Sequence, residues 1–203
     1  MFFLVTGASG VGKSTVRKII SEEFGNSITC AELAHLGLIP EWSLSWRQRA
    51  VERAVQIALE AQNAGRHFLL CGDPIPPGEV YAAPSAPRLA AISTCLLDAS
   101  PEAQQARLLS RGDDPNLTPH HLAFAAWMRG HAKDHLDRPE VIIHNGWDQM
   151  QWDRWTKLPP GNPPWACEII DTSSLSPQDV AEMVAGWIRN GIRHHLASNL
   201  TTL

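Results

Sequence analysis

The sequence predicts an α/β fold in which a parallel β-sheet lies between helices on both of its faces. Short apolar runs with strand character alternate along the 203 residues with longer segments that repeat apolar residues at helical spacing. The first run, residues 2–6, passes through a glycine-rich turn directly into the first helical segment. Ser-Pro and Thr-Pro pairs mark the starts of later helices. Such alternation is typical of β-α-β units, whose strands are parallel.

We expect five strands and five helices, which together cover about half of the chain. The strands are expected at residues 2–6, 27–31, 67–72, 91–97 and 167–171. The helices are expected at residues 13–24, 46–64, 101–111, 118–134 and 177–189, with a frayed tail after Gly191. Residues 33–45 and the proline-rich stretch 74–87 are expected to be irregular. Residues 137–165 combine several Trp with a run of Pro and show no clear periodicity.

Composition excludes several classes of protein. The net charge of −4 argues against a surface that binds nucleic acid, so no nucleic-acid partner is expected. No run of 18 apolar residues occurs, so we expect no membrane span, and the short apolar start does not resemble a secretory leader. The four cysteines are isolated and are expected as buried thiols. We therefore expect a cytoplasmic monomer or homodimer with residues 1–203 forming one domain.

A phosphate-binding loop follows the first strand. The run matches the pattern G-x-x-x-x-G-K-[ST] in full and comprises Gly7, Ala8, Ser9, Gly10, Val11, Gly12, Lys13, Ser14 and Thr15. Its glycines allow backbone N–H groups to converge on phosphate oxygens, and the helix N-terminus adds partial positive charge. Lys13 is expected to reach the β- and γ-phosphates, and the Ser14 hydroxyl to bind Mg²⁺. The sequence therefore predicts a nucleoside triphosphate site, with ATP and Mg²⁺ as cofactors.

Two carboxylates follow strands at the edge of the sheet where ligands of α/β proteins bind. Asp73 comes after the apolar run 68–72, where a carboxylate would hold Mg²⁺ or its water shell, although Asp-Pro is also ordinary turn chemistry. Glu32 ends the second strand. It could orient or deprotonate an attacking hydroxyl, or it could be a solvated side chain at the start of a helix. Both are candidate catalytic residues.

Basic and aromatic side chains supply further candidates. Arg107 and Arg111 lie four residues apart on one helix and could stabilise the charge of a transferring phosphoryl group. On the second helix, Arg47, Arg49 and Arg53 could hold an acceptor, although a solvated charged face is the commoner explanation. Trp42 and Trp46 could stack on a planar substrate or simply pack.

His131 and His135 have helical spacing, but they lack the further ligands that a metal site needs. We expect their segment to be a polar helix end that forms a lid or a wall of the acceptor site, and we expect no metal there.

With these residues in view, the layout resembles the group of P-loop small-molecule and nucleoside-monophosphate kinases. That group includes adenylate, shikimate and gluconate kinases and chloramphenicol phosphotransferase. The resemblance spans almost the whole chain in the order of elements, but only the loop at residues 7–15 is a specific motif. It implies a three-layer P-loop NTPase fold, with a parallel sheet in the order 2-3-1-4-5. It also implies an acceptor-binding segment at residues 33–64 and a lid with an insert at residues 111–165.

The resemblance also implies roles for individual residues. An acidic residue that ends strand two often handles the acceptor hydroxyl in such kinases, and Glu32 matches it, although Asp is commoner there. Arg107 and Arg111 fit arginines that lie against the adenine and the phosphates. Thr172 and Ser173 fit a loop that brackets the adenine.

The sequence favours an ATP-dependent kinase for a small molecule that carries a hydroxyl group. The adenylate-kinase pattern Asp-Gly-x-Pro-Arg is absent, because Gly72-Asp73-Pro74 stands there, and this argues against an ordinary nucleotide kinase. The acceptor could be a metabolite, a nucleoside or an antibiotic. Two alternatives remain: a regulatory ATPase or switch without an acceptor, and a protein that binds nucleotide for structural reasons. No N-K-x-D signature for guanine appears, and the choice between ATP and GTP stays open.

Overall fold

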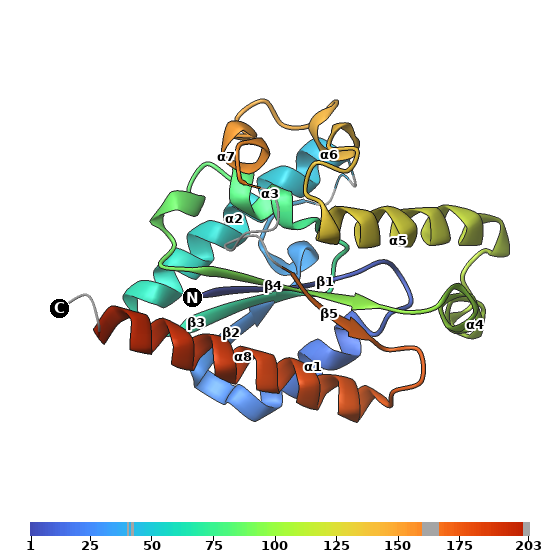
Figure 1. Ribbon diagram of the computed structural model, residues 1–203, viewed down its shortest axis with the longest axis horizontal. Helices are drawn as coiled ribbons and strands as arrows, with labels where there is room; N and C mark the ends of the chain where they lie inside the picture. Colours follow the sequence, from blue (N-terminus) through green and yellow to red (C-terminus); the bar gives the residue numbers. More distant parts are fainter. Residues whose placement is uncertain (40, 42, 160–166, 201–203) are drawn as a thin grey trace.

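The computed structural model describes residues 1–39, 41, 43–159 and 167–200. It contains a central β-sheet with helices on both faces (Figure 1). The strands are β1 (Phe2–Thr6), β2 (Ile28–Ala31), β3 (His67–Cys71), β4 (Ile92–Asp98) and β5 (Cys167–Asp171). The helices are α1 (Lys13–Phe24), α2 (Leu44–Asn63), α3 (Pro77–Ala82), α4 (Pro101–Arg111), α5 (Thr118–Lys133), α6 (Glu140–Ile143), α7 (Asp153–Thr156) and α8 (Pro177–Leu200).

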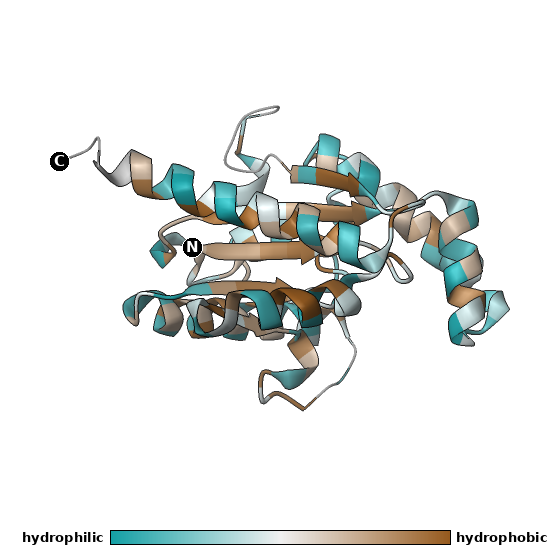
Figure 2. Cartoon of the chain, turned by 90° about the horizontal axis from the view of Figure 1, so that it is seen from below, coloured by the Kyte–Doolittle hydropathy of each residue, from teal (hydrophilic) through white to brown (hydrophobic). Residues whose placement is uncertain are grey.

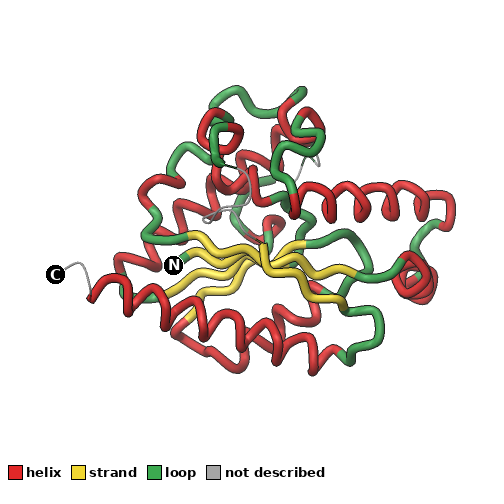
Figure 3. Tube along the Cα trace, in the orientation of Figure 1, coloured by secondary structure: helices red, strands yellow, loops and turns green. Residues whose placement is uncertain are grey.

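The sheet is parallel throughout and its strands stand in the order β2-β3-β1-β4-β5. This confirms the predicted three-layer α/β fold and strand order. Because all the strands run in one direction, as their arrows show in Figure 1, their carboxyl ends lie along the same edge of the sheet, where Figure 3 draws the loops that follow them in green. Four predicted parts of the site therefore meet at this edge: the loop after β1, Glu32 after β2, Asp73 after β3 and Thr172 after β5.

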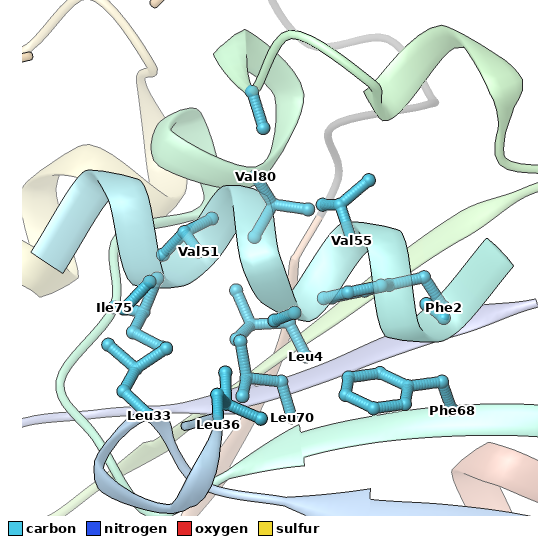
Figure 4. Packing of buried hydrophobic residues seen from close by; sticks show 14 of the residues in the cluster. Phe2, Leu4, Leu33, Leu36, Val51, Val55, Phe68, Leu70, Ile75 and Val80 are labelled. Carbon is cyan, nitrogen blue, oxygen red and sulfur yellow. The ribbon is translucent and has the colours of Figure 1, made fainter. Parts of the chain in front are cut away.

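Successive side chains along each strand point to opposite faces of the sheet, and they fill two separate cores. On one face, Phe2, Leu4, Phe68 and Leu70 pack against α2 and against Ile75 and Val80 (Figure 4). On the other face, Phe3, Val5, Leu69, Cys95 and Leu97 pack against apolar residues of α1 and α8. Figure 2 shows the same division, with apolar strands and polar outer faces on α1 and α8. The two cores fix the sheet, and with it the edge that carries the predicted site.

A third cluster extends the first face beyond β4. Trp127, Met128 and Ala132 of α5 pack with Leu96 and with Ile142 of α6. In Figure 1, α6 and α7 lie above α2 and α3 on this same side of the sheet. Residues 140–156, which lacked a clear sequence pattern, thus form part of the layer that covers the sheet.

Two sequence expectations for the elements were wrong, and one stretch without an assigned element contains helices. The proline-rich stretch contains the helix α3, which begins at Pro77. Proline is tolerated in the first turn of a helix because the backbone N–H groups there have no partner within the helix. Two short helices, α6 and α7, interrupt the stretch from 137 to 159. The last helix continues through Gly191 to Leu200. A Cβ at Gly191 would come within 3.0 Å of the Phe3 ring, so this glycine allows α8 to lie close to the sheet.

In the described part of the chain, no helix combines the length and the apolar character needed to cross a membrane.

Candidate functional site: two adjoining cavities at the carboxyl edge of the sheet

The loop between β1 and α1 is shaped by its glycines. Gly7, Gly10 and Gly12 have φ of +144°, +85° and +100°, a region that residues with a Cβ rarely adopt. Gln104 of α4 donates a 2.8 Å hydrogen bond from Nε2 to the carbonyl oxygen of Ser9, which ties the loop to a neighbouring helix. The geometry agrees with the sequence motif, since the loop wraps the N-terminus of α1 and leaves Ser14 and Thr15 exposed.

The ammonium group of Lys13 lies inside the loop. It donates hydrogen bonds of 2.8 Å to the carbonyl oxygens of Gly7 and Ala8, and the side chain is buried. Burial lowers the pKa of Lys13 to about 8, although the nearby Asp73 carboxylate and Cys71 thiol oppose that shift. The loop thus holds a desolvated cation whose charge is available for an anion that displaces the two carbonyl contacts.

Arg107 connects α4 to the loop after β5. Its Nη1 donates a 2.8 Å hydrogen bond to the Thr172 hydroxyl, and its Nη2 donates to the carbonyl oxygens of Thr172 and Ser173. Arg111, one turn further along α4, forms a bidentate pair with Asp113 instead. The structure therefore brings Arg107, Thr172 and Ser173 together, as the resemblance implied, and leaves Arg111 on the more exposed rim.

These residues enclose a cavity of about 600 Å³. Its lining includes residues 9–16 of the loop and α1, Gly72 and Pro74 after β3, Arg107 and Arg111 of α4, and Thr172, Leu175, Pro177 and Val180. A cavity of this size lies within the range of about 300–1,000 Å³ that is usual for small-molecule sites. It combines main-chain amides at one end with the apolar and polar groups around Thr172 at the other.

Glu32 and Asp73 lie side by side, as their positions after β2 and β3 predicted. A Cβ on Gly72 would lie 2.6 Å from Glu32 Oε2, so the two loops are in close contact. Asp73 Oδ2 accepts a 2.7 Å hydrogen bond from the Leu33 N–H. Burial raises the pKa of Asp73; the Leu33 hydrogen bond opposes this rise, and the charge of Glu32 adds to it.

Glu32 has a cationic partner that the sequence analysis missed. Its Oε2 lies 3.2 Å from Arg17 Nη2, and its Oε1 lies 3.0 Å from His35 Nδ1. Arg17 comes four residues after Lys13 on α1, so helical spacing alone points it toward the same edge of the sheet. Glu32 lines neither of the two cavities described here, whereas Asp73 lines one of them directly.

That second cavity has a volume of about 330 Å³. It is lined by Leu33, Ser43, Leu44, Trp46, Arg47, Asp73, Pro74, Phe124 and Val141. Pro74 lines both cavities, so the two adjoin at the loop after β3. Trp46 and Arg47, predicted from the sequence as acceptor-side residues, do line this space.

Other sequence candidates lie elsewhere. Arg49 pairs with Glu41 and Arg53 with Glu60, both on exposed surface, and neither lines a cavity described here. Trp42 lies outside the described residues, as does the Pro-rich run at 160–164. His131 is buried between the rings of Trp127 and Trp155, where aromatic packing accounts for it. No cluster of three or more His, Cys, Asp or Glu side chains suited to a metal occurs among the residues that the structure describes.

Comparison with solved structures finds proteins that share this fold. A sugar kinase from Janibacter sp. HTCC2649 superposes with a TM-score of 0.59 at 15% sequence identity, covering 93% of this chain and 94% of that chain. The chain shares its fold with that kinase. The protein APE1195 superposes with a TM-score of 0.54 at 14% identity, covering 94% of this chain and 95% of that chain. No family model matches the sequence, and no curated protein does. At these identities the likeness concerns the fold alone.

Proposed function

We propose that this protein is an ATP-dependent phosphotransferase that moves the γ-phosphoryl group of ATP to a hydroxyl group of a small molecule. One observation carries the proposal: a cavity lined by a complete phosphate-binding loop adjoins a second cavity, and the Asp73 carboxylate faces the second. A kinase needs two adjoining sites of this kind, because its nucleotide and its acceptor must react directly. The sugar kinase that shares the fold of this chain supports the proposal of a phosphotransferase.

The residues suit a triphosphate along the larger cavity. The loop amides and Lys13 would hold the β- and γ-phosphates, and the loop at Thr172 and Ser173 with Arg107 would contact the base or ribose. The exposed Ser14 hydroxyl is an oxygen donor of the type that Mg²⁺ prefers, and Asp73 would hold the water shell that Mg²⁺ usually keeps beside its phosphate ligands. When bound there, Mg²⁺ would neutralise charge on the β- and γ-phosphates.

The reaction follows from the arrangement of the two cavities. The acceptor oxygen forms a bond to the γ-phosphorus, and the bond between that phosphorus and the bridging β–γ oxygen breaks, which releases ADP. Lys13 stabilises the negative charge on the transferring group, and Arg111 at the rim can add to it. The hydroxyl proton passes to a carboxylate.

Of the two candidate carboxylates, Asp73 suits the proton better than Glu32. It borders the acceptor cavity directly, whereas Glu32 lines neither cavity. Glu32, held between Arg17 and His35, would then position the loops rather than take the proton.

The test is acceptor-dependent release of the nucleoside diphosphate, ADP or GDP. Purified protein with Mg²⁺ and either ATP or GTP is assayed against nucleosides, sugars, shikimate-like acids and antibiotics. We expect at least one class to stimulate release and to yield a phosphorylated product by mass spectrometry. Lys13→Ala should abolish transfer, whereas Lys18→Ala, which removes an exposed lysine of the same helix, should not. Turnover that no acceptor stimulates would favour a regulatory ATPase instead.

A further inference from the structure

The smaller cavity has a lining that selects among acceptors. Six of its nine residues are apolar or aromatic: Leu33, Leu44, Trp46, Pro74, Phe124 and Val141. Its volume of about 330 Å³ lies at the low end of the range for small-molecule sites. If this cavity receives the acceptor, as the proposed function requires, then most of the acceptor's surface meets hydrocarbon. The space fits a small molecule with an apolar body.

The cavity's one described cation is already paired. Arg47 Nε donates a 2.9 Å hydrogen bond to Glu79 Oε2, and Arg47 Nη2 lies 2.6 Å from Glu79 Oε1. The Glu79 side chain is 0% exposed, whereas that of Arg47 is 22% exposed. A buried bidentate pair of this kind presents almost no net charge to the cavity. An anionic acceptor would therefore gain little from Arg47 and would also face the Asp73 carboxylate.

Few polar groups line the cavity, and they are partly engaged. The Ser43 hydroxyl accepts a 3.0 Å hydrogen bond from the Trp46 N–H as the N-cap of α2. Asp73 Oδ2 accepts from the Leu33 N–H, which leaves its other oxygen for one acceptor hydroxyl. A sugar has several hydroxyls, and those without a partner in an apolar cavity each cost free energy. The lining suits a molecule with one reacting hydroxyl better than a sugar.

We propose that the acceptor is an uncharged alcohol with a small apolar or aromatic body, and that Glu79 sets this preference by neutralising Arg47. Glu79 acts through Arg47, so it is a specificity-determining residue that does not contact the reacting atoms. Without it, the Arg47 guanidinium would present its charge to the cavity and attract a carboxylate or phosphate on the acceptor. The inference rests on the proposed function, which assigns this cavity to the acceptor.

The experiment compares benzyl alcohol with para-(hydroxymethyl)benzoate, which carries a carboxylate on the same ring, and uses glucose as a third probe. In the unmodified protein we expect kcat/KM for benzyl alcohol to exceed that for the benzoate by about tenfold or more, and glucose to be the poorest. Glu79→Gln should raise kcat/KM for the benzoate by about tenfold, the scale of one charge-assisted hydrogen bond, and leave benzyl alcohol less affected.

Glu52→Gln is the matched control. Glu52 is also a buried glutamate in contact with this layer, but it accepts hydrogen bonds from Ser85 and Gln56 and does not line the cavity. Glu52→Gln should leave the ratio of kcat/KM between benzyl alcohol and para-(hydroxymethyl)benzoate unchanged. The combined variant Arg47→Met with Glu79→Met removes both charges at once, avoids a lone buried charge, and should preserve the preference for benzyl alcohol.

Each outcome decides the matter. A preference of the unmodified protein for the benzoate or for glucose, or an equal shift of the ratio in Glu79→Gln and Glu52→Gln, overturns the inference. If Glu79→Gln does not fold, loss of the preference in the combined variant overturns it. If no probe is phosphorylated, calorimetric titration decides instead, and tighter binding of para-(hydroxymethyl)benzoate than of benzyl alcohol overturns the inference. A protein that phosphorylates charged acceptors alone would refute the inference while leaving the proposed function intact.

Discussion

Arg107 and Thr172 join α4 to the loop after β5 through contacts with both the side chain and the backbone of the threonine. Arg107 Nη1 donates to the Thr172 hydroxyl at 2.8 Å, and Thr172 donates in turn to the Asp98 carbonyl oxygen through its N–H and its hydroxyl, both at 2.8 Å. These contacts form one wall of the larger cavity. The guanidinium is therefore held in position before any nucleotide enters.

Replacing Arg107 should weaken nucleotide binding more than replacing Arg111. For Arg107→Leu we expect the dissociation constant for Mg-ATP to rise about tenfold to a hundredfold, because hydrogen bonds to a charged group contribute about 1.5–3 kcal/mol. Arg111 is exposed and paired with Asp113, so Arg111→Ala should have a smaller effect. Titration calorimetry measures both constants. Equal losses in the two variants would show that the wall formed by Arg107 has no special part in binding.

Gly72 should not tolerate a side chain. Its φ is +147°, and a Cβ would meet Glu32 Oε2 at 2.6 Å and Glu32 Cβ at 2.8 Å. We expect Gly72→Ala to lower the free energy of unfolding by about 1–3 kcal/mol and to displace Asp73, so that kcat also falls. Chemical denaturation and kinetics on the same preparation measure the two effects.

Gly186 provides the matched control for Gly72. It lies inside α8, and a Cβ there would meet nothing within 4 Å. Gly186→Ala should raise the free energy of unfolding by about 0.5–1 kcal/mol, because alanine favours a helix. A destabilisation by Gly72→Ala no greater than that of an average surface substitution would contradict the close contact between the two loops.

The sequence predicted the sheet and one of the cavities because each depends on local patterns. The alternation of strands and helices follows from the periodicity of apolar residues. The loop at residues 7–15 follows from a motif whose spacing is specific to phosphate binding. The positions of Glu32, Asp73 and Thr172 follow from a general rule for parallel sheets, which brings strand ends together without knowledge of packing.

The apolar and nearly uncharged character of the second cavity could not be predicted in this way. Its character depends on the pairing of Arg47 with Glu79, which are 32 residues apart and lie on different helices. Glu79 stands in a proline-rich stretch whose composition is typical of a loop, and only tertiary packing buries it. Arg17 was missed for another reason: its spacing from Lys13 points it toward the same edge of the sheet, but only the folded structure shows that Glu32 is its partner.

His131 should make the protein sensitive to acid. Burial lowers the pKa of His131 below its ordinary value, with its ring between Trp127 and Trp155. Because the folded state disfavours the proton, stability is present above the unfolded pKa near about 6.5 and is lost as pH falls through the folded pKa. Between about pH 6.5 and about pH 5, His131→Phe should lose less stability than the unmodified protein, by at most about 1.4 kcal/mol per pH unit. Urea denaturation at both pH values tests this, and parallel losses would contradict it.

Lys13 should make nucleotide binding sensitive to alkali. With a pKa of about 8, its protonated fraction falls from about three quarters at about pH 7.5 to about one tenth at about pH 9. Phosphate charge in the complex favours the ammonium form, so binding at about pH 8.5 should take up a proton, and the dissociation constant for Mg-ATP should rise about eightfold across this interval. Calorimetry in buffers of different ionisation enthalpy measures both quantities. Lys13→Arg keeps its charge throughout and should give a flat profile, even if its overall affinity is lower. An unmodified protein whose affinity stays constant to about pH 9 would mean that the Lys13 ammonium is not the group that holds the phosphates.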